Sequence, residues 1–251
     1  MDIIDIHCHI LPGIDDGSPD LEETIGMLYL AAASGVKKIV ATPHSYVDKG
    51  DFLSFREKID DAYSSVCGVI KHEKIPVELL LGMELLITGD LEDRLYSKSY
   101  ITMNETKNIL IEFTFEEPFE YMDSAIKTIL AEGLTPVIAH PERYVEIQGN
   151  PERVRSWLEK GCMLQLNKGS FIGYFGEESK KSAVYLLKKG FAQFIASDAH
   201  SSKSRTTYLR NIEDFLNNYF GEEYSEILLK RNSEALLYGG KPEFVHSKNN
   251  G

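Results

Sequence analysis

The feature that most constrains this chain is a series of short apolar segments that each end near a histidine or a carboxylate. Five of the seven histidines stand where such a segment ends, and acidic residues stand at matching places. Side chains brought together at the strand ends of an α/β barrel would form one polynuclear metal site. The pattern therefore indicates a metal-dependent hydrolase. The residues concerned are His7, His9, Asp16, His44, Glu84, Glu112, His140, Asp198 and His200.

Apolar runs of strand length alternate with longer amphipathic segments along the chain. The predicted strands are Ile3–His7, Lys38–Thr42, Val77–Gly82, Asn108–Phe113, Thr135–Ala139, Met163–Asn167 and Gln193–Ser197. The predicted helices are Pro19–Ser34, Phe55–Lys71, Tyr121–Glu132, Pro151–Lys160, Glu177–Lys189, Thr207–Tyr219 and Glu223–Leu237. For the first helix, Ser18 is the expected N-cap, Pro19 the first helical residue, and Gly35 the residue beyond the end.

This alternation predicts a parallel sheet with right-handed crossovers. An open, doubly wound sheet would gather ligands at one switch point, whereas here they come from six of the seven strands or from the loops that follow. The prediction is therefore an α/β fold, a distorted (β/α)7 TIM-like barrel. Residues 1–238 are expected to form a single domain and residues 239–251 a flexible C-terminal tail.

The formal net charge of −12 argues against nucleic acid as a partner, because strand binding needs a basic groove. The three cysteines are widely spaced and odd in number, which fits a reducing compartment. The N-terminus lacks the features of a secretory signal, and the most apolar stretch is too short and too charged to span a bilayer. A cytoplasmic protein without membrane insertion is expected. The sequence does not give the oligomeric state, so both a monomer and an oligomer fit it.

His7 and His9 are two apart on a predicted strand, so both imidazoles point to one face while Cys8 points away. A His-x-His pair alone is weak evidence for a metal site, because two polar residues can also stand at a strand end without binding a metal. The coincidence with the other strand-end residues is what indicates a metal, because a buried Glu84 or Glu112 is costly without a cation.

Five histidines and four carboxylates are too many ligands for one ion and enough for two or three. The set contains no cysteine and suits manganese, iron or zinc rather than a structural zinc–thiolate site. Three divalent ions would outweigh four carboxylates and leave a positive pocket, which favours an anionic substrate such as a phosphate. Asp15 and Asp16 are adjacent and are not expected to face the same ion, but spacing does not choose between them. One of the two is expected to turn the loop before Ser18.

Two arginines follow the candidate ligands. Arg143 lies just after His140 and Arg205 lies five residues after His200. Arginine binds phosphate oxygens with a planar fork and stabilises charge during phosphoryl transfer. The alternative for each is a surface arginine in a weak ion pair. The aromatic stretch from Phe171 to Gly176 could line the site entrance or simply fold its rings onto the barrel.

Other phosphate chemistries lack their motifs. No cysteine is followed six residues later by an arginine, and neither a Walker phosphate loop nor a Gly-x-Gly-x-x-Gly fingerprint is present. A Gly-x-Ser-x-Gly nucleophile elbow is also missing.

Several stretches resemble the PHP (polymerase and histidinol phosphatase) superfamily. They are Ile6–His9, Ala41–His44, Ile138–Arg143 and Ala196–His200. The chain is closer still to the bacterial PHP-type protein-tyrosine phosphatases of the capsule-regulating CpsB/YwqE kind, through His9–Gly17, Leu110–Phe113 and the His-Pro-Glu-Arg run. The resemblance covers the chain from Met1 to about Leu237.

The resemblance implies a distorted seven-stranded barrel with a trinuclear centre, often containing manganese, and a phosphotyrosine substrate on the C-terminal tail of a tyrosine kinase that controls polysaccharide export. It also implies that Asp16, rather than Asp15, is a ligand. By motif, His7, His9, Glu84 and Asp198 would surround one ion, Glu84, Glu112 and His140 a second, and Asp16, His44 and His200 a third. Arg143 and Arg205 would contact the phosphate.

The expected reaction is in-line hydrolysis of a phosphoric monoester by a metal-activated hydroxide, with no covalent phospho-enzyme. Asp198 or His200, or a metal-bound water, could supply a proton to the leaving tyrosine oxygen. Three other readings are a small-molecule phosphatase of the same superfamily, such as a histidinol-phosphatase, a nuclease, and a non-catalytic metal-binding regulator. Fold alone does not fix the substrate, so the first of these is the main alternative.

Overall fold

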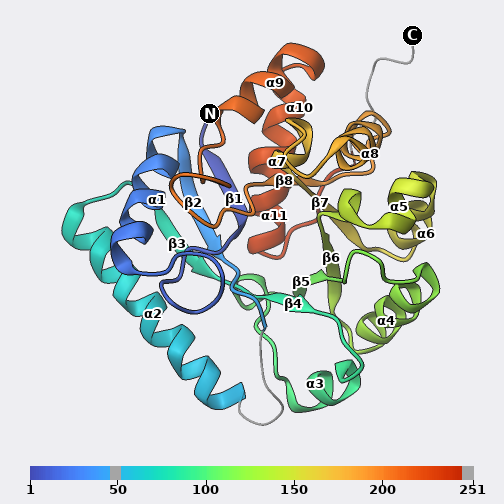
Figure 1. Cartoon of the computed structure of the whole chain (residues 1–251), viewed down its shortest axis with the longest axis horizontal. Helices are drawn as coiled ribbons and strands as arrows, with labels where there is room; N and C mark the ends of the chain where they lie inside the picture. Colours follow the sequence, from blue (N-terminus) through green and yellow to red (C-terminus); the bar gives the residue numbers. More distant parts are fainter. Residues whose placement is uncertain (46–51, 245–251) are drawn as a thin grey trace.

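The computed structural model describes residues 1–45 and 52–244. Its strands are all parallel to their neighbours and lie in two sheets, of order β1-β2-β3 and β4-β5-β6-β7-β8. Figure 1 shows the helices arranged around the outside of these strands. The strands are β1 (Ile3–Cys8), β2 (Val36–Ala41), β3 (Glu78–Leu81), β4 (Glu84–Leu86), β5 (Asn108–Glu112), β6 (Thr135–Ala139), β7 (Met163–Asn167) and β8 (Phe194–Ala196).

The two sheets meet at both of their edges and form the predicted distorted barrel. At one seam, the Asp198 amide donates to the His7 carbonyl at 2.9 Å and the His9 amide donates to the Ala199 carbonyl at 2.9 Å. At the other seam, a parallel bridge joins His44 to Glu84. The fold class expected from strand and helix alternation is confirmed.

The third predicted strand, Val77–Gly82, corresponds to β3 to within one residue at each end, but the sequence did not predict the short strand β4 that follows it. β3 pairs with β2, whereas β4 pairs with β5. Glu84 is therefore the first residue of β4 rather than a loop residue. The change of partner occurs at Gly82, where an added Cβ would lie 2.8 Å from the Met103 sulfur and 3.1 Å from Val40. A larger residue would crowd both neighbours at this step.

The helices that follow the strands broadly match the prediction, with several short helices added. The sequence did not predict η1, α3, α5 or α7, which are too short to show a helical period. The helices are α1 (Leu21–Ala33), α2 (Phe52–Glu73), α3 (Leu91–Ser97), η1 (Met103–Glu105), α4 (Phe119–Ala131), η2 (Pro141–Arg143), α5 (Val145–Gly149), η3 (Pro151–Arg153), α6 (Val154–Glu159), α7 (Lys168–Phe171), α8 (Glu177–Lys188), α9 (Arg210–Phe220), α10 (Glu222–Glu226), η4 (Ile227–Arg231) and α11 (Asn232–Leu237).

The predicted start of the first helix was wrong. Asp20 is the N-cap of α1, and its side chain accepts a hydrogen bond from the Glu23 amide. Ser18 is buried instead, and its hydroxyl bonds the Thr24 hydroxyl at 2.8 Å and donates to the Asp20 carbonyl. Both residues are good caps, and the loop geometry turns Ser18 inward. Gly35 follows the helix as expected, with φ of 91°.

A bulge in β1 sets which side chains face the barrel interior. Asp5 pairs with Ile39 and Cys8 with Ala41, so three steps along β1 match two steps along β2. Strict alternation would place His7 on the face opposite Ile6. The extra residue lets Ile4 and Ile6 join the inner core while His7 and His9 face inward above it.

The inner core is closed at the end opposite the histidines by η1 and α11. Leu236 and Leu237 are buried against apolar side chains from the strands, and the Leu236 carbonyl accepts a hydrogen bond from the Asn108 amide at 2.7 Å. The segment after α11 is held by the side chain of Asn232, which forms hydrogen bonds with the backbone amide and carbonyl of Glu243. Residues 245–251 of the predicted tail lie outside the described residues, and its flexibility stays a prediction.

We expect Leu236→Ala to lower the free energy of unfolding by about 2–5 kcal/mol, because it leaves a cavity at the base of the barrel. Leu53→Ala is the matched control, since Leu53 is 75% exposed and its loss should change stability by less than about 0.5 kcal/mol. Urea denaturation of both variants measures the difference. Equal stabilities would contradict the role of α11 as the closing element.

Candidate metal centre

All nine predicted ligand residues meet at the carboxyl end of the barrel. They come from β1, β2, β4, β5, β6 and β8 or the loops that follow, and every one except Asp16 is buried. Eight of them form three groups, each with donor atoms within 4.8 Å of one another, and His140 joins the cluster through Glu84. The groups are His7, His9 and Asp198; His44, Glu84 and Glu112; and His9, Asp16, His44 and His200.

Glu84 lies at the middle of the cluster. Its Oε2 atom is 3.2 Å from Nε2 of both His7 and His9, and 3.1 Å from Nδ1 of His44. Its Oε1 atom is 3.0 Å from Nε2 of His140. One buried carboxylate thus contacts four imidazoles, which fits the bridging position that the family resemblance implies.

Asp198 faces the His7 and His9 side of the cluster. Its Oδ1 atom lies 3.6 Å from His7 Nε2 and 3.4 Å from His9 Nε2. Those two Nε2 atoms are 3.1 Å apart. Both imidazoles of the His-x-His pair therefore point to one small volume, and Cys8 between them is buried on the other face.

His44 lies between the second and third groups. Its Nδ1 atom is 2.9 Å from Glu112 Oε1, and its Nε2 atom is 3.4 Å from Asp16 Oδ1. Asp16 Oδ1 also lies 3.5 Å from His200 Nε2, whereas His140 Nε2 is 3.8 Å from Glu112 Oε2. The grouping differs from the expected one at two residues, because His44 also reaches Glu84 and Glu112, and His9 also lies in the group of Asp16, His44 and His200.

The structure separates the roles of the two adjacent aspartates. Asp15 is turned inward, where its Oδ2 contacts His9 Nδ1 at 2.8 Å and accepts from the His44 amide at 3.0 Å, while its Oδ1 accepts from the Gly17 amide. Asp16 faces the open side, with 61% of its side chain exposed. Asp15 thus turns the loop and orients His9.

Two further polar residues support the cluster and were not predicted. Gln165 Oε1 lies 2.8 Å from His7 Nδ1, and the Asn167 amide donates to Asp198 Oδ2 at 2.6 Å. Both lie on the inward face of β7, two residues apart. A sequence signal existed, because two polar side chains alternate within an otherwise apolar strand.

The cluster holds charge that only cations or protons can balance. Burial works to lower the pKa of His9, but its close contacts with the carboxylates of Asp15, Asp198 and Glu84 outweigh burial and raise the pKa well above its usual value. Burial opposes ionisation of Glu84, yet the neighbouring histidines hold its pKa well below the ordinary range. For His200, burial and the nearby His9 lower the pKa to about 3, which leaves a neutral imidazole.

This donor set fits divalent metal ions. Imidazole nitrogens and carboxylate oxygens converge without a thiolate, and isolated buried carboxylates would be costly without positive charge. Glu84 Oε2 is buried, and among the described residues no donor reaches it with hydrogen-bond geometry. An oxygen in that state, facing three imidazole nitrogens, is suited to a metal ligand.

Both predicted arginines lie beside the cluster. Arg205 Nη2 is 2.6 Å from Asp198 Oδ1, and Arg143 Nη1 is 3.5 Å from Asp198 Oδ2. The Arg143 guanidinium carbon lies 4.2 Å from the ring centre of Phe115 and 4.1 Å from that of Phe175. Two aromatic faces therefore hold this charge in place.

The backbone is strained at three of these positions. His140, Asp198 and Arg205 have φ values of 34°, 47° and 46°, in the left-handed region that non-glycine residues seldom adopt. Such conformations cost about 1–3 kcal/mol each and persist only where surrounding contacts fix them. Their concentration at the site is typical of a functional centre.

The chain is similar in sequence to known tyrosine-protein phosphatases. The chain is 38% identical to the tyrosine-protein phosphatase YwqE of Bacillus subtilis over 94% of this chain and 91% of that protein. It is 32% identical to the tyrosine-protein phosphatase CpsB of Streptococcus pneumoniae over 94% of this chain and 98% of that protein.

Solved structures give the same relationship. One from a study of YwqE and CpsB, described as metal-dependent tyrosine phosphatases, covers 97% of this chain and 99% of its own, with a TM-score of 0.86 and 35% identity. A mutant organophosphorus hydrolase from Deinococcus radiodurans aligns over 94% of this chain and 93% of its own with a TM-score of 0.58, but at 12% identity it shows only a shared fold. Residues 3–238 match the family described as capsular polysaccharide synthesis, CpsB/CapC, and the chain belongs to that family.

Proposed function

We propose that this chain is a metal-dependent protein-tyrosine phosphatase that hydrolyses phosphotyrosine in a protein. The observation that carries the proposal is the convergence of nine nitrogen and oxygen ligands and two arginines at one end of the barrel. The relatives named as tyrosine-protein phosphatases support the substrate class. A histidinol-phosphatase activity remains the main alternative, because the same site would hold another phosphate monoester.

We propose that the site holds two or three divalent ions, with manganese first and iron or zinc as alternatives. When bound, these ions would supply Lewis acidity that lowers the pKa of water and offsets phosphate charge. The residues that would hold them are the nine of the cluster: His7, His9, Asp16, His44, Glu84, Glu112, His140, Asp198 and His200.

The protein's own part in the reaction is to bind and orient the phosphate. Arg143 and Arg205 are partly exposed and border Asp198 from two sides, so both guanidinium groups can reach a phosphate that enters from solvent. Stacking on Phe115 and Phe175 restricts Arg143 before substrate arrives, which limits the ordering cost of binding. His200 and Asp198 lie 3.6 Å apart beside this space and remain the proposed groups for moving a proton.

The proposed protein substrate is the C-terminal tail of a tyrosine kinase involved in polysaccharide export. The capsular polysaccharide family supports this setting. None of the described helices is long and apolar enough to cross a membrane. A cytoplasmic location belongs to the same proposal, and three cysteines without a disulfide support it.

The first test is phosphate release by manganese-loaded protein from a phosphotyrosine peptide, a phosphoserine peptide and histidinol phosphate. We expect fast release from phosphotyrosine alone, with loss of activity when a chelator removes the ions. His44→Ala should also lose activity, because His44 contacts both Asp16 and Glu112. Preference for histidinol phosphate would contradict the proposed phosphotyrosine substrate. Equal rates of phosphate release with and without chelator would contradict the proposed metal requirement.

The role of Arg143 is tested by Arg143→Lys. We expect kcat/KM for phosphotyrosine to fall about 10²–10³-fold, because an ammonium cannot reproduce the planar fork or its stacking between two rings. Arg155→Lys is the matched control, since Arg155 is an exposed partner of Glu152 on the outside of the barrel. Similar kinetics for both variants would remove Arg143 from the binding site.

The role of Asp15 is tested by Asp15→Asn, followed by calorimetric titration of the metal-free protein with manganese. We expect affinity to fall about 10–100-fold, because the carboxylate that orients His9 is lost while every proposed ligand stays. Asp2→Asn, at an exposed position, serves as control. Unchanged affinity would show that Asp15 only shapes the loop.

A further inference from the structure

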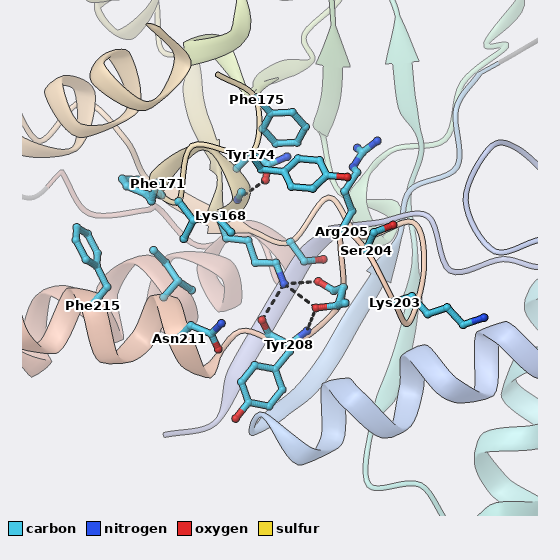
Figure 2. A pocket seen from close by; sticks show the side chains of 16 residues that line it. Lys168, Phe171, Tyr174, Phe175, Lys203, Ser204, Arg205, Tyr208, Asn211 and Phe215 are labelled. Carbon is cyan, nitrogen blue, oxygen red and sulfur yellow. Dashed lines mark hydrogen bonds between the residues drawn. The ribbon is translucent and has the colours of Figure 1, made fainter. Parts of the chain in front are cut away.

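A pocket of about 360 Å3 (Figure 2) has Arg205 in its wall, and the same arginine contacts Asp198 of the metal centre. The pocket is bordered by α7 and the turn that follows it, by residues 203–208 and by the first two turns of α9. The volume is at the lower end of the range of roughly 300–1,000 Å3 for ligand pockets. This space suits one large side chain better than a cofactor or a folded partner.

Apolar rings form most of the pocket wall. Phe171 and Phe215 lie at one end with ring centres 5.7 Å apart and planes tilted by 41°, and Tyr174 and Phe175 lie at the other end with ring centres 5.1 Å apart (Figure 2). Ile172 and Tyr174 are 75% and 54% exposed, although both are apolar enough to favour burial. A ligand that covered them would remove this exposed surface from water.

The charge of the pocket is opposite to that of the whole chain. Lys168, Lys203 and Arg205 line it, and none of the described lining residues is acidic, although the protein carries a net charge of −12. A cationic side chain would be repelled here. An uncharged ring in an acidic or neutral segment would be accepted.

A partly buried lysine holds the pocket open. Lys168 Nζ donates to the backbone carbonyls of Thr206, through a short hydrogen bond, and of Tyr208 at 2.8 Å (Figure 2). These bonds tie α7 to the segment that carries Arg205. The wall is therefore formed before a ligand binds, which favours recognition at low ordering cost.

We propose that this pocket binds an aromatic side chain of the phosphoprotein that lies one to three residues from the phosphotyrosine. This rests on the proposed phosphatase function. Arg205 forms part of the pocket wall and also contacts Asp198 in the metal centre, so one peptide can occupy both spaces. An extended peptide advances roughly 3.3–3.6 Å per residue, which limits the separation to a few residues.

The test compares kcat/KM for phosphotyrosine peptides of alanine background with phenylalanine placed at each nearby position in turn. Phosphotyrosine amide, which lacks neighbours, measures the metal centre alone. We expect phenylalanine at one position to raise kcat/KM roughly tenfold over alanine. Lysine at that position should give no gain or a loss.

Asn211→Trp then locates the effect. Asn211 is an exposed residue at the pocket rim, and a large ring there should reduce the phenylalanine advantage to less than about twofold. Asn218→Trp is the matched control, because Asn218 is exposed on the same helix outside the pocket and should leave the advantage intact.

The outcomes separate the two proposals. Release from phosphotyrosine amide with no preference among the peptides would overturn the pocket and leave the phosphatase function standing. A phenylalanine preference that survives Asn211→Trp would also overturn the pocket. No release from any phosphotyrosine compound would overturn the function and the pocket proposal with it.

Discussion

The buried carboxylate of Glu84 connects the architecture of this protein to its chemistry. Glu84 is the first residue of β4, and its backbone amide donates a hydrogen bond to the Pro43 carbonyl at the seam between the two sheets. Its side chain contacts the imidazoles of His7, His9, His44 and His140. A carboxylate in that position is stable only if cations or protons surround it. Barrel closure and the proposed metal site therefore depend on the same residue.

The geometry of the cluster is fixed from outside by a second set of polar contacts. Asp15 and Gln165 bond the far nitrogens of His9 and His7, so that both Nε2 atoms face the cluster. Asn167 bonds Asp198, and its own backbone amide donates to Glu142 Oε1 at 2.8 Å. Partners of this kind orient metal ligands and tune their basicity. They lie on rigid strands or short loops, which keeps the site from rearranging.

The aromatic residues link substrate binding to the metal centre. The ring centre of Phe175 lies 4.1 Å from the guanidinium carbon of Arg143 and 5.6 Å from that of Arg205. One ring therefore borders both of the arginines proposed to bind phosphate. The sequence left this aromatic stretch open between lining the entrance and folding onto the barrel. The structure supports both, since Phe171 is buried and Tyr174 is exposed. In the proposed scheme, the segment that would contact the peptide therefore also borders both arginines.

The sequence by itself determined the alternation of strands and helices, and it placed His7, His44, Glu112, His140 and Asp198 at strand ends. Those follow from local periodicity, because parallel strands bring their carboxyl ends to one face. Only the tertiary structure decided the bulge that turns His7 inward, the break that makes Glu84 the start of a new strand, and the inward turn of Asp15. The first two depend on strand pairing with residues far along the chain, and Asp15 is held inward in part by the amide of His44, 29 residues further on. Local pattern carries no information about such partners, which is why residue spacing alone left Asp15 and Asp16 unresolved.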